Sequence, residues 1–228
     1  MKNAHAALKT AIAAKGVAVP DGAKLTDMPA LVEQIPSAPA YTDSKRFYQR
    51  SGLDSIDVQN VVYVDFSKVK NITGCFLGCS NLTSLALPAG FGEAAITITG
   101  CFQNCSSLKS LVLPDGFCQN AENLSRCFHN CSSLTTLHLP TGFGQNSTSN
   151  KYCFSSCVAL TTITGNPNFK ATVDLTPCKN LTHDSIMVVI NGLQTVTEAQ
   201  TLLLGSENLA KLTDEEKQIA TDKGWTLA

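Results

Sequence analysis

The chain has 228 residues, of which 43% are hydrophobic and 15% are charged, and its formal net charge at pH 7 is −1. This composition supplies enough apolar material for a core but no basic surface for nucleic acid or an anionic membrane, so we expect neither partner. No apolar run approaches the roughly 18–20 residues that span a bilayer, and lysines interrupt the N-terminal stretch, so the sequence predicts neither membrane insertion nor a signal peptide.

Residues 1–35 predict a helical N-terminal module. The stretch from Asn3 to Ala14 is rich in alanine and is followed by Gly16, a residue typical of helix ends. Asp27 can cap a second helix that carries Pro29 in its first turn. Residues 36–45 combine Pro, Ser and Ala and predict a linker.

A tandem repeat follows the linker. The pattern Cys-Phe-x-x-Cys occurs four times, and each copy starts 26 residues after the previous one. Leucines, a proline and a second phenylalanine recur with the same period, as in Leu85, Pro88 and Phe91 of the first copy. Such a period predicts stacked units that share one continuous core. The first cysteines of the pairs are Cys75, Cys101, Cys127 and Cys153, and the second are Cys79, Cys105, Cys131 and Cys157.

Each unit contains the pattern of one short strand. In Leu82-x-x-Leu85-x-Leu87 the last residues alternate, so Leu85 and Leu87 face one side while Ser84 and Ala86 face the other. Pro88 ends the strand because it has no N–H for a ladder. Stacked units would place successive strands about 4.8 Å apart in a parallel sheet.

The repeat weakens at both ends. Cys178 and Leu181 resemble a fifth unit that arrives five residues early, and the stretch from Val62 to Phe66 resembles the end of a unit without a cysteine turn. Beyond the array, we expect helices near His183 to Ile190 and Asp214 to Asp222, with a strand at residues 201–204 between them.

The motif Phe-x-x-Cys-x-x-Leu followed by Leu-x-x-Leu-x-Leu-Pro resembles the BspA-type leucine-rich repeat of bacterial surface proteins. That family usually has alanine where this chain has the first cysteine of each pair. The resemblance implies an α/β leucine-rich-repeat solenoid with short parallel strands over residues 46–182 and an α/β C-terminal cap over residues 183–228. Residues 8–35 resemble a module of phage and prophage tail-associated proteins, and residues 208–225 are similar to tails that close such arrays in gut-bacterial and prophage proteins.

The cysteines allow three interpretations. A ladder of buried structural thiols accounts best for the eight paired cysteines, because an unreacted cysteine packs as a small hydrophobe. Disulfides between adjacent units would have a suitable separation but parallel Cβ vectors, and zinc sites usually pair cysteines two residues apart. Cys118 and Cys178 depart from the pattern and are the first candidates for a reactive thiol, although inert core thiols remain the favoured interpretation.

Catalysis is not expected. His129 and His138 lie close in sequence to Cys127, but nothing marks an orienting group or an oxyanion hole. Other units have unrelated residues at the histidine positions, which favours variable surface residues. Seven Asn-x-Ser/Thr sequons, including those at Asn104 and Asn130, arise from the repeat itself, and hydrogen bonding along the ladder explains them better than glycosylation.

The outward positions of the four strands form the candidate binding strip. Its residues are small, uncharged or only weakly polar, and the strip is equally compatible with a protein ligand, a glycan ligand or a hydrated surface. The candidates are Ser84, Ala86, Ser110, Val112, Thr136, His138, Thr162 and Thr164.

We therefore predict a non-enzymatic binding or adhesion module that uses no cofactor. Its expected partner is a protein or glycan on a host or particle surface, and an open end of the array could also pair with a second copy. The resemblances favour a phage or prophage tail component, or else a bacterial cell-surface or extracellular protein. The alternative from a different class is a thiol-based metal-binding or redox protein that uses the Cys-x3-Cys pairs.

Overall fold

The computed structural model describes residues 55–57 and 69–228. These residues belong to one compact unit. The predicted N-terminal module (1–35), the linker (36–45) and the Val62 to Phe66 segment lie outside the described residues.

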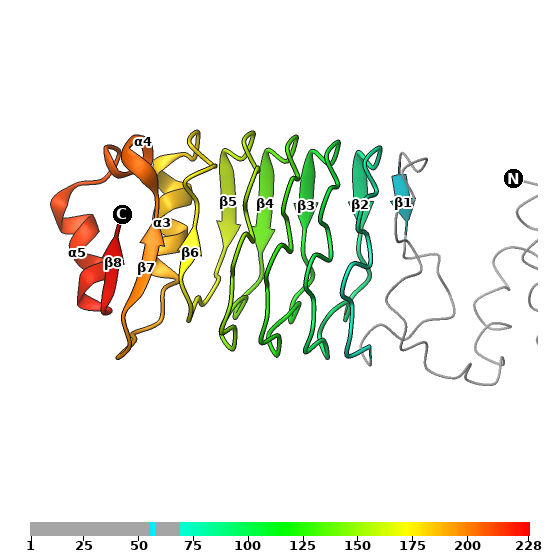
Figure 1. Cartoon of the computed structure of the whole chain (residues 1–228), viewed down its shortest axis with the longest axis horizontal. Helices are drawn as coiled ribbons and strands as arrows, with labels where there is room; N and C mark the ends of the chain where they lie inside the picture. The colour runs from blue at the N-terminus through cyan, green and yellow to red at the C-terminus, as the bar shows by residue number, and fades with distance from the viewer. Residues whose placement is uncertain (1–54, 58–68) are drawn as a thin grey trace, which may run out of the picture. The chain divides into compact units, whose positions relative to one another are not determined.

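Five short strands follow one another in chain order (Figure 1): β1 (Ser55–Asp57), β2 (Ser84–Ala86), β3 (Ser110–Val112), β4 (Thr136–Leu139) and β5 (Thr162–Gly165). Strands β3, β4 and β5 form one parallel sheet in which Leu111, Leu137 and Ile163 are partners. The 26-residue offset between these partners confirms the predicted repeat.

The first strand does not keep this offset. Ile56 of β1 pairs in parallel with Leu85 of β2, and these partners are 29 residues apart. The unit that begins at β1 is therefore three residues longer than those that follow. Strand β1 lies within residues 46–182, the range expected for the repeats.

A second parallel ladder runs along another side of the units. Single bridges join Asn71 to Thr97, Thr97 to Asn123, and Asn123 to Ser149. Between the two ladders, the Cys-Phe turns bond to each other across units, as where Phe102 N–H donates to the Cys127 carbonyl at 2.9 Å.

The units require left-handed backbone at several positions, one of which lies just before the second cysteine of each pair. Asn104 and Asn130 occupy the position before the second cysteine with φ of 64° and 58°, and asparagine tolerates this region better than most residues. The Asn130 side-chain amide donates to the Asn104 side-chain oxygen at 3.1 Å. This bond is the ladder contact expected at these sequons.

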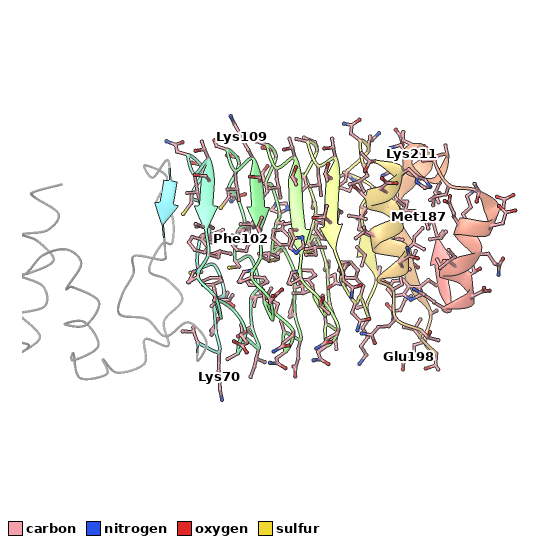
Figure 2. All side chains as sticks on the ribbon, turned by 180° about the vertical axis from the view of Figure 1, so that it is seen from behind. Lys70, Phe102, Lys109, Met187, Glu198 and Lys211 are labelled. Carbon is pink, nitrogen blue, oxygen red and sulfur yellow. The ribbon has the colours of Figure 1, made fainter. Side chains whose placement is uncertain are left out.

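Two columns of phenylalanine rings fill the core. Phe76, Phe102, Phe128 and Phe154 form one column, and their successive ring centroids are 5.4, 5.6 and 5.6 Å apart. The second column contains Phe91, Phe117, Phe143 and Phe169, with separations of 6.0, 6.4 and 5.9 Å. All eight rings are buried, and Figure 2 shows Phe102 in the interior between the two edges of the array.

The C-terminal part carries the remaining elements. The strands are β6 (Val173–Asp174), β7 (Gln200–Leu203) and β8 (Trp225–Leu227), which form a three-stranded parallel sheet. The helices are α3 (His183–Asn191), α4 (Gly205–Leu209) and α5 (Asp214–Asp222). The positions of α3, β7 and α5 confirm the elements expected there, whereas the pattern did not predict α4, β6 and β8.

Helix α3 packs against β5, the last strand of the β3-β4-β5 sheet. It lies where the strand of one more repeat would have paired with β5. The Ser185 side chain of this helix takes the place of a neighbouring strand's backbone. Its hydroxyl accepts from Ile163 N–H at 2.9 Å and donates to the Thr161 carbonyl at 3.1 Å. The edge of β5 is thus covered, which removes a template for pairing with another chain.

Candidate binding surface and buried thiols

The outward side chains of β2 to β5 form one surface, which we call the strand face. It consists of the predicted strip residues Ser84, Ala86, Ser110, Val112, Thr136, His138, Thr162 and Thr164. His138 and Thr162 are half-buried and the other six are exposed. Val112 is 67% exposed and is the largest unsupported apolar side chain on this surface.

The strand face contains no Lys, Arg, Asp or Glu side chain. The register sets its geometry, since Ser110 faces Thr136 and Thr136 faces Thr162 across the sheet. His138 Nδ1 lies 3.0 Å from the Thr164 hydroxyl oxygen, so these two side chains are joined across β4 and β5. A partner that covers this surface avoids desolvating charged side chains, but it has to supply hydrogen bonds to the hydroxyl groups, because burying an unpaired hydroxyl is unfavourable.

All ten cysteines lie within the described residues, and every one is buried without a disulfide there. Three of the second cysteines donate to a phenylalanine carbonyl of the preceding unit. The donors Cys105, Cys131 and Cys157 lie 3.2, 3.2 and 3.0 Å from the carbonyl oxygens of Phe76, Phe102 and Phe128. These thiols therefore form hydrogen bonds between adjacent units inside the core.

Burial opposes the thiolate form of these cysteines. Loss of hydration, with a smaller effect of Cys79, raises the pKa of Cys75 to about 12. Burial likewise raises the pKa of Cys157 to about 12. The pKa values of Cys118 and Cys178, the two candidates for a reactive thiol, are also raised mainly by burial, and both side chains are fully buried. The thiolate is the form of cysteine that acts as a nucleophile and binds metals. Because burial disfavours the thiolate, these environments favour cysteines that pack as neutral thiols.

The histidines and cysteine considered for catalysis have separate surroundings. Cys127 is fully buried, and burial raises its pKa well above the ordinary value. His138 contacts Thr164 on the strand face. His129 was expected as a variable surface residue, but it is half-buried, and its Nδ1 has no hydrogen-bond partner among the described residues. Close packing of the turns, which sequence variation does not reveal, buries this nitrogen.

Two adjoining hollows lie between the last repeat and the C-terminal part, and the sequence analysis did not predict them. They have volumes of about 420 and 360 Å³ and share Thr148, Ala171 and Gln200 in their walls. The signal in the sequence was the early arrival of Cys178, which shortens the chain beside them.

Within residues 55–57 and 69–228, no cluster of three or more His, Cys, Asp or Glu side chains could hold a metal ion. The helices in this part of the chain are too short or too polar for any of them to cross a membrane.

Comparison with known proteins identifies the repeat. The family described as the BspA type leucine rich repeat region matches residues 43–176 in six copies. No curated protein matches the chain significantly. Among solved structures, the crystal structure of a leucine-rich repeat protein from T. pallidum aligns with a TM-score of 0.38 and 19% identity, over 81% of this chain and 76% of the other. Because the family match covers more than half of the sequence, this chain belongs to the BspA-type leucine-rich repeat family.

Proposed function

We propose that this chain is a non-catalytic binding module whose strand face contacts a protein on a host or particle surface. The single observation that carries this proposal is the exposed, uncharged face of β2 to β5, with Val112 67% exposed at its middle. Membership of the leucine-rich repeat family supports a protein partner, because such repeats generally serve protein interaction.

The packing of the array favours this use of the strand face. Each outward residue is held by a strand whose inward neighbour is buried, as Val112 is held beside Leu111. The face is therefore rigid before any partner arrives, which reduces the entropy cost of binding. Outward residues can also change from unit to unit without altering the core.

The biological setting we propose is attachment at a phage particle or a bacterial surface. The resemblance of residues 8–35 to a module of phage tail-associated proteins supports the first setting, and the family's occurrence in bacterial surface proteins supports the second. An antibody against the chain, applied to fractionated source cells before and after phage induction, separates the two. Co-sedimentation with particles supports the tail component, and residence in the envelope without particles supports the cell-surface protein.

The alternative of a thiol-based metal-binding or redox protein is disfavoured. It requires accessible cysteines, and all ten are buried. Burial raises the pKa values of the Cys75 and Cys157 thiols to about 12, which leaves almost no thiolate near neutral pH.

Two matched substitutions test the strand face. Val112→Asp places a charge on it, whereas Ile96→Asp places the same charge on another exposed apolar residue, 42% exposed and bonded through its N–H to Lys70 on the second ladder. The probe is the labelled full chain bound to intact host cells, with and without protease treatment of those cells.

We expect Val112→Asp to lower protease-sensitive binding about tenfold or more, since a charge at the centre of an interface must be desolvated without a partner. Ile96→Asp is expected to bind as the unmodified chain does. Equal binding by both variants, or equal loss in both, would refute the strand face as the docking surface.

A further inference from the structure

The hollows described above originate in a shortened repeat. Cys178 follows Cys157 by 21 residues, whereas the earlier second cysteines are 26 apart. The missing residues belong to the outer segment that carries the second ladder, which ends at Ser149 in the described residues. The chain beyond Ser149 therefore leaves an open space where another outer segment would have packed.

A buried asparagine adapts the core to this shortening. Asn150 stands where the earlier units have Ile72, Ile98 and Leu124, and it is only 4% exposed. Its amide donates to the Ala171 carbonyl at 2.8 Å and to the Thr172 carbonyl at 3.3 Å, and its oxygen accepts from the Ser147 hydroxyl at 2.8 Å. A fully bonded polar group thus replaces an apolar one and fixes the floor of the space.

Together the two hollows form one groove, which we call the junction groove. Residues 147–152 form one wall, residues 170–174 the floor, and residues 194–203 the other wall. Glu198 from the second wall lies at the same edge of the array as Lys70, opposite Lys109 and Lys211 (Figure 2). The hollows, at about 420 and 360 Å³, fall within the range of about 300–1,000 Å³ that is usual for small-ligand sites.

The groove presents fixed hydrogen-bonding groups. The Gln200 side-chain oxygen accepts from Thr172 N–H at 2.7 Å and from the Thr172 hydroxyl at 3.0 Å, which leaves its NH₂ group available to a ligand. One Asp174 oxygen accepts from the N–H and hydroxyl of Thr176, at 2.9 and 2.7 Å, and the second has no partner within the described residues. A donor and an acceptor are thereby held in place, and both suit a hydroxyl group, which donates and accepts.

The charges that line the groove balance. Lys151 and Lys170 contribute two positive charges, and Asp174 and Glu198 contribute two negative ones. The remaining lining consists mainly of hydroxyls and amides. Because the lining has no net charge, it does not attract a strongly anionic or cationic ligand. The hydroxyls and amides of the lining instead favour a neutral ligand rich in hydroxyl groups.

One exposed aromatic side chain borders the groove at a costly backbone position. Tyr152 has φ of 60°, a region in which a bulky residue is strained. The equivalent positions of the three earlier units hold Gly74, Gly100 and Arg126, with φ of 61°, 61° and 57°. Tyr152 is nevertheless 45% exposed. The Arg126 guanidinium carbon and the Lys151 ammonium lie 5.5 and 5.1 Å from its ring centroid, which restrains the ring.

We propose that the junction groove binds a neutral oligosaccharide, with a sugar ring stacked on Tyr152. The aromatic face is electron-rich, so it attracts the weakly positive C–H groups on the face of a pyranose ring. The sugar must share this ring with, or displace, the Arg126 and Lys151 cations that lie over it. The NH₂ group of Gln200 and the second carboxylate oxygen of Asp174 then bind sugar hydroxyls. This site is separate from the strand face and does not depend on the protein contact proposed there.

The first experiment probes the full chain with an array of neutral oligosaccharides of two to six hexose units, and measures Kd for those retained. Tyr152→Gly introduces the residue that two of the three earlier units, at Gly74 and Gly100, have at this position. We expect it to weaken binding about tenfold or more, because aromatic contacts dominate such sites. Its Tm should be unchanged or higher, because glycine adopts this φ without strain. A purely structural role for Tyr152 predicts the opposite change in Tm.

A second variant removes one hydrogen-bond donor from the groove. Gln200→Glu keeps the oxygen that accepts from Thr172 but replaces the NH₂ group with a second acceptor, so the fold is retained and affinity should fall. Val112→Asp on the strand face should leave oligosaccharide binding unchanged, which separates the two sites. Retention of acidic sugars alone, failure to bind any neutral oligosaccharide, or full binding by Tyr152→Gly would each overturn the proposal.

Discussion

The two columns of phenylalanine rings predict that identical substitutions in one column have unequal costs. Phe102 lies in the middle of its column and contacts three rings, those of Phe76 at 5.4 Å, Phe128 at 5.6 Å and Phe117 at 6.1 Å. Phe154, at the end of the same column, contacts the ring of Phe128 at 5.6 Å. Both side chains are almost fully buried, at 0% and 1% exposure. The substitutions Phe102→Leu and Phe154→Leu thus differ mainly in the number of ring pairs lost.

The expected difference follows from the ring pairs. An aromatic pair contributes about 0.5–1.5 kcal/mol beyond its burial, so the two extra pairs make Phe102→Leu about 1–3 kcal/mol more destabilising than Phe154→Leu. The loss of apolar volume is the same in both variants, because both replace the same residue at a buried site.

Urea unfolding of the full chain measures this difference. Far-UV circular dichroism follows the array, and fluorescence of Trp225, the single tryptophan, follows the C-terminal part. The slopes of free energy against urea should match between the variants, so that the midpoints report stability directly. Equal losses in the two variants, or a larger loss for Phe154→Leu, would refute the assignment of this stability to ring stacking.

Three further predictions concern the thiols and the C-terminal part. A thiol reagent at about pH 8 should find close to none of the ten cysteines in the folded chain and all ten after denaturation; rapid reaction of the folded chain would contradict their burial. Ser185→Ala should destabilise the chain by about 1–3 kcal/mol in urea, because Ile163 N–H loses its acceptor in a buried place, and an unchanged midpoint would show that the bond is dispensable. The hydrogen bond from His183 to Glu216 at 2.8 Å raises the pKa of His183 above 6.5. Its stabilisation is therefore complete below about pH 6.5 and is lost as pH rises through the folded-state pKa, so the Tm advantage of the unmodified chain over His183→Gln should be larger at about pH 5 than at about pH 9; a constant difference would argue against the pair.

Periodicity alone was sufficient to predict the repeating part of the fold. The 26-residue spacing of Leu111, Leu137 and Ile163 placed them as strand partners, because identical units stack with identical offsets. Helices α3 and α5 were also predictable, since Thr182 and Thr213 are N-caps whose hydroxyls accept from N–H groups three residues on. The repeat spacing and the helix caps can be read directly from the sequence, because they depend only on which residues occur at which positions.

The tertiary structure decided the features at which the pattern breaks. The 29-residue offset between Ile56 and Leu85, and the replacement of a strand partner by Ser185, depend on how non-equivalent segments meet in space. The junction groove likewise needs Gln200 beside Thr172, a contact between residues 28 apart that no repeat specifies. A sequence pattern predicts what each unit does with its neighbours of the same kind; where the units end, only the path of the folded chain determines which side chains come together.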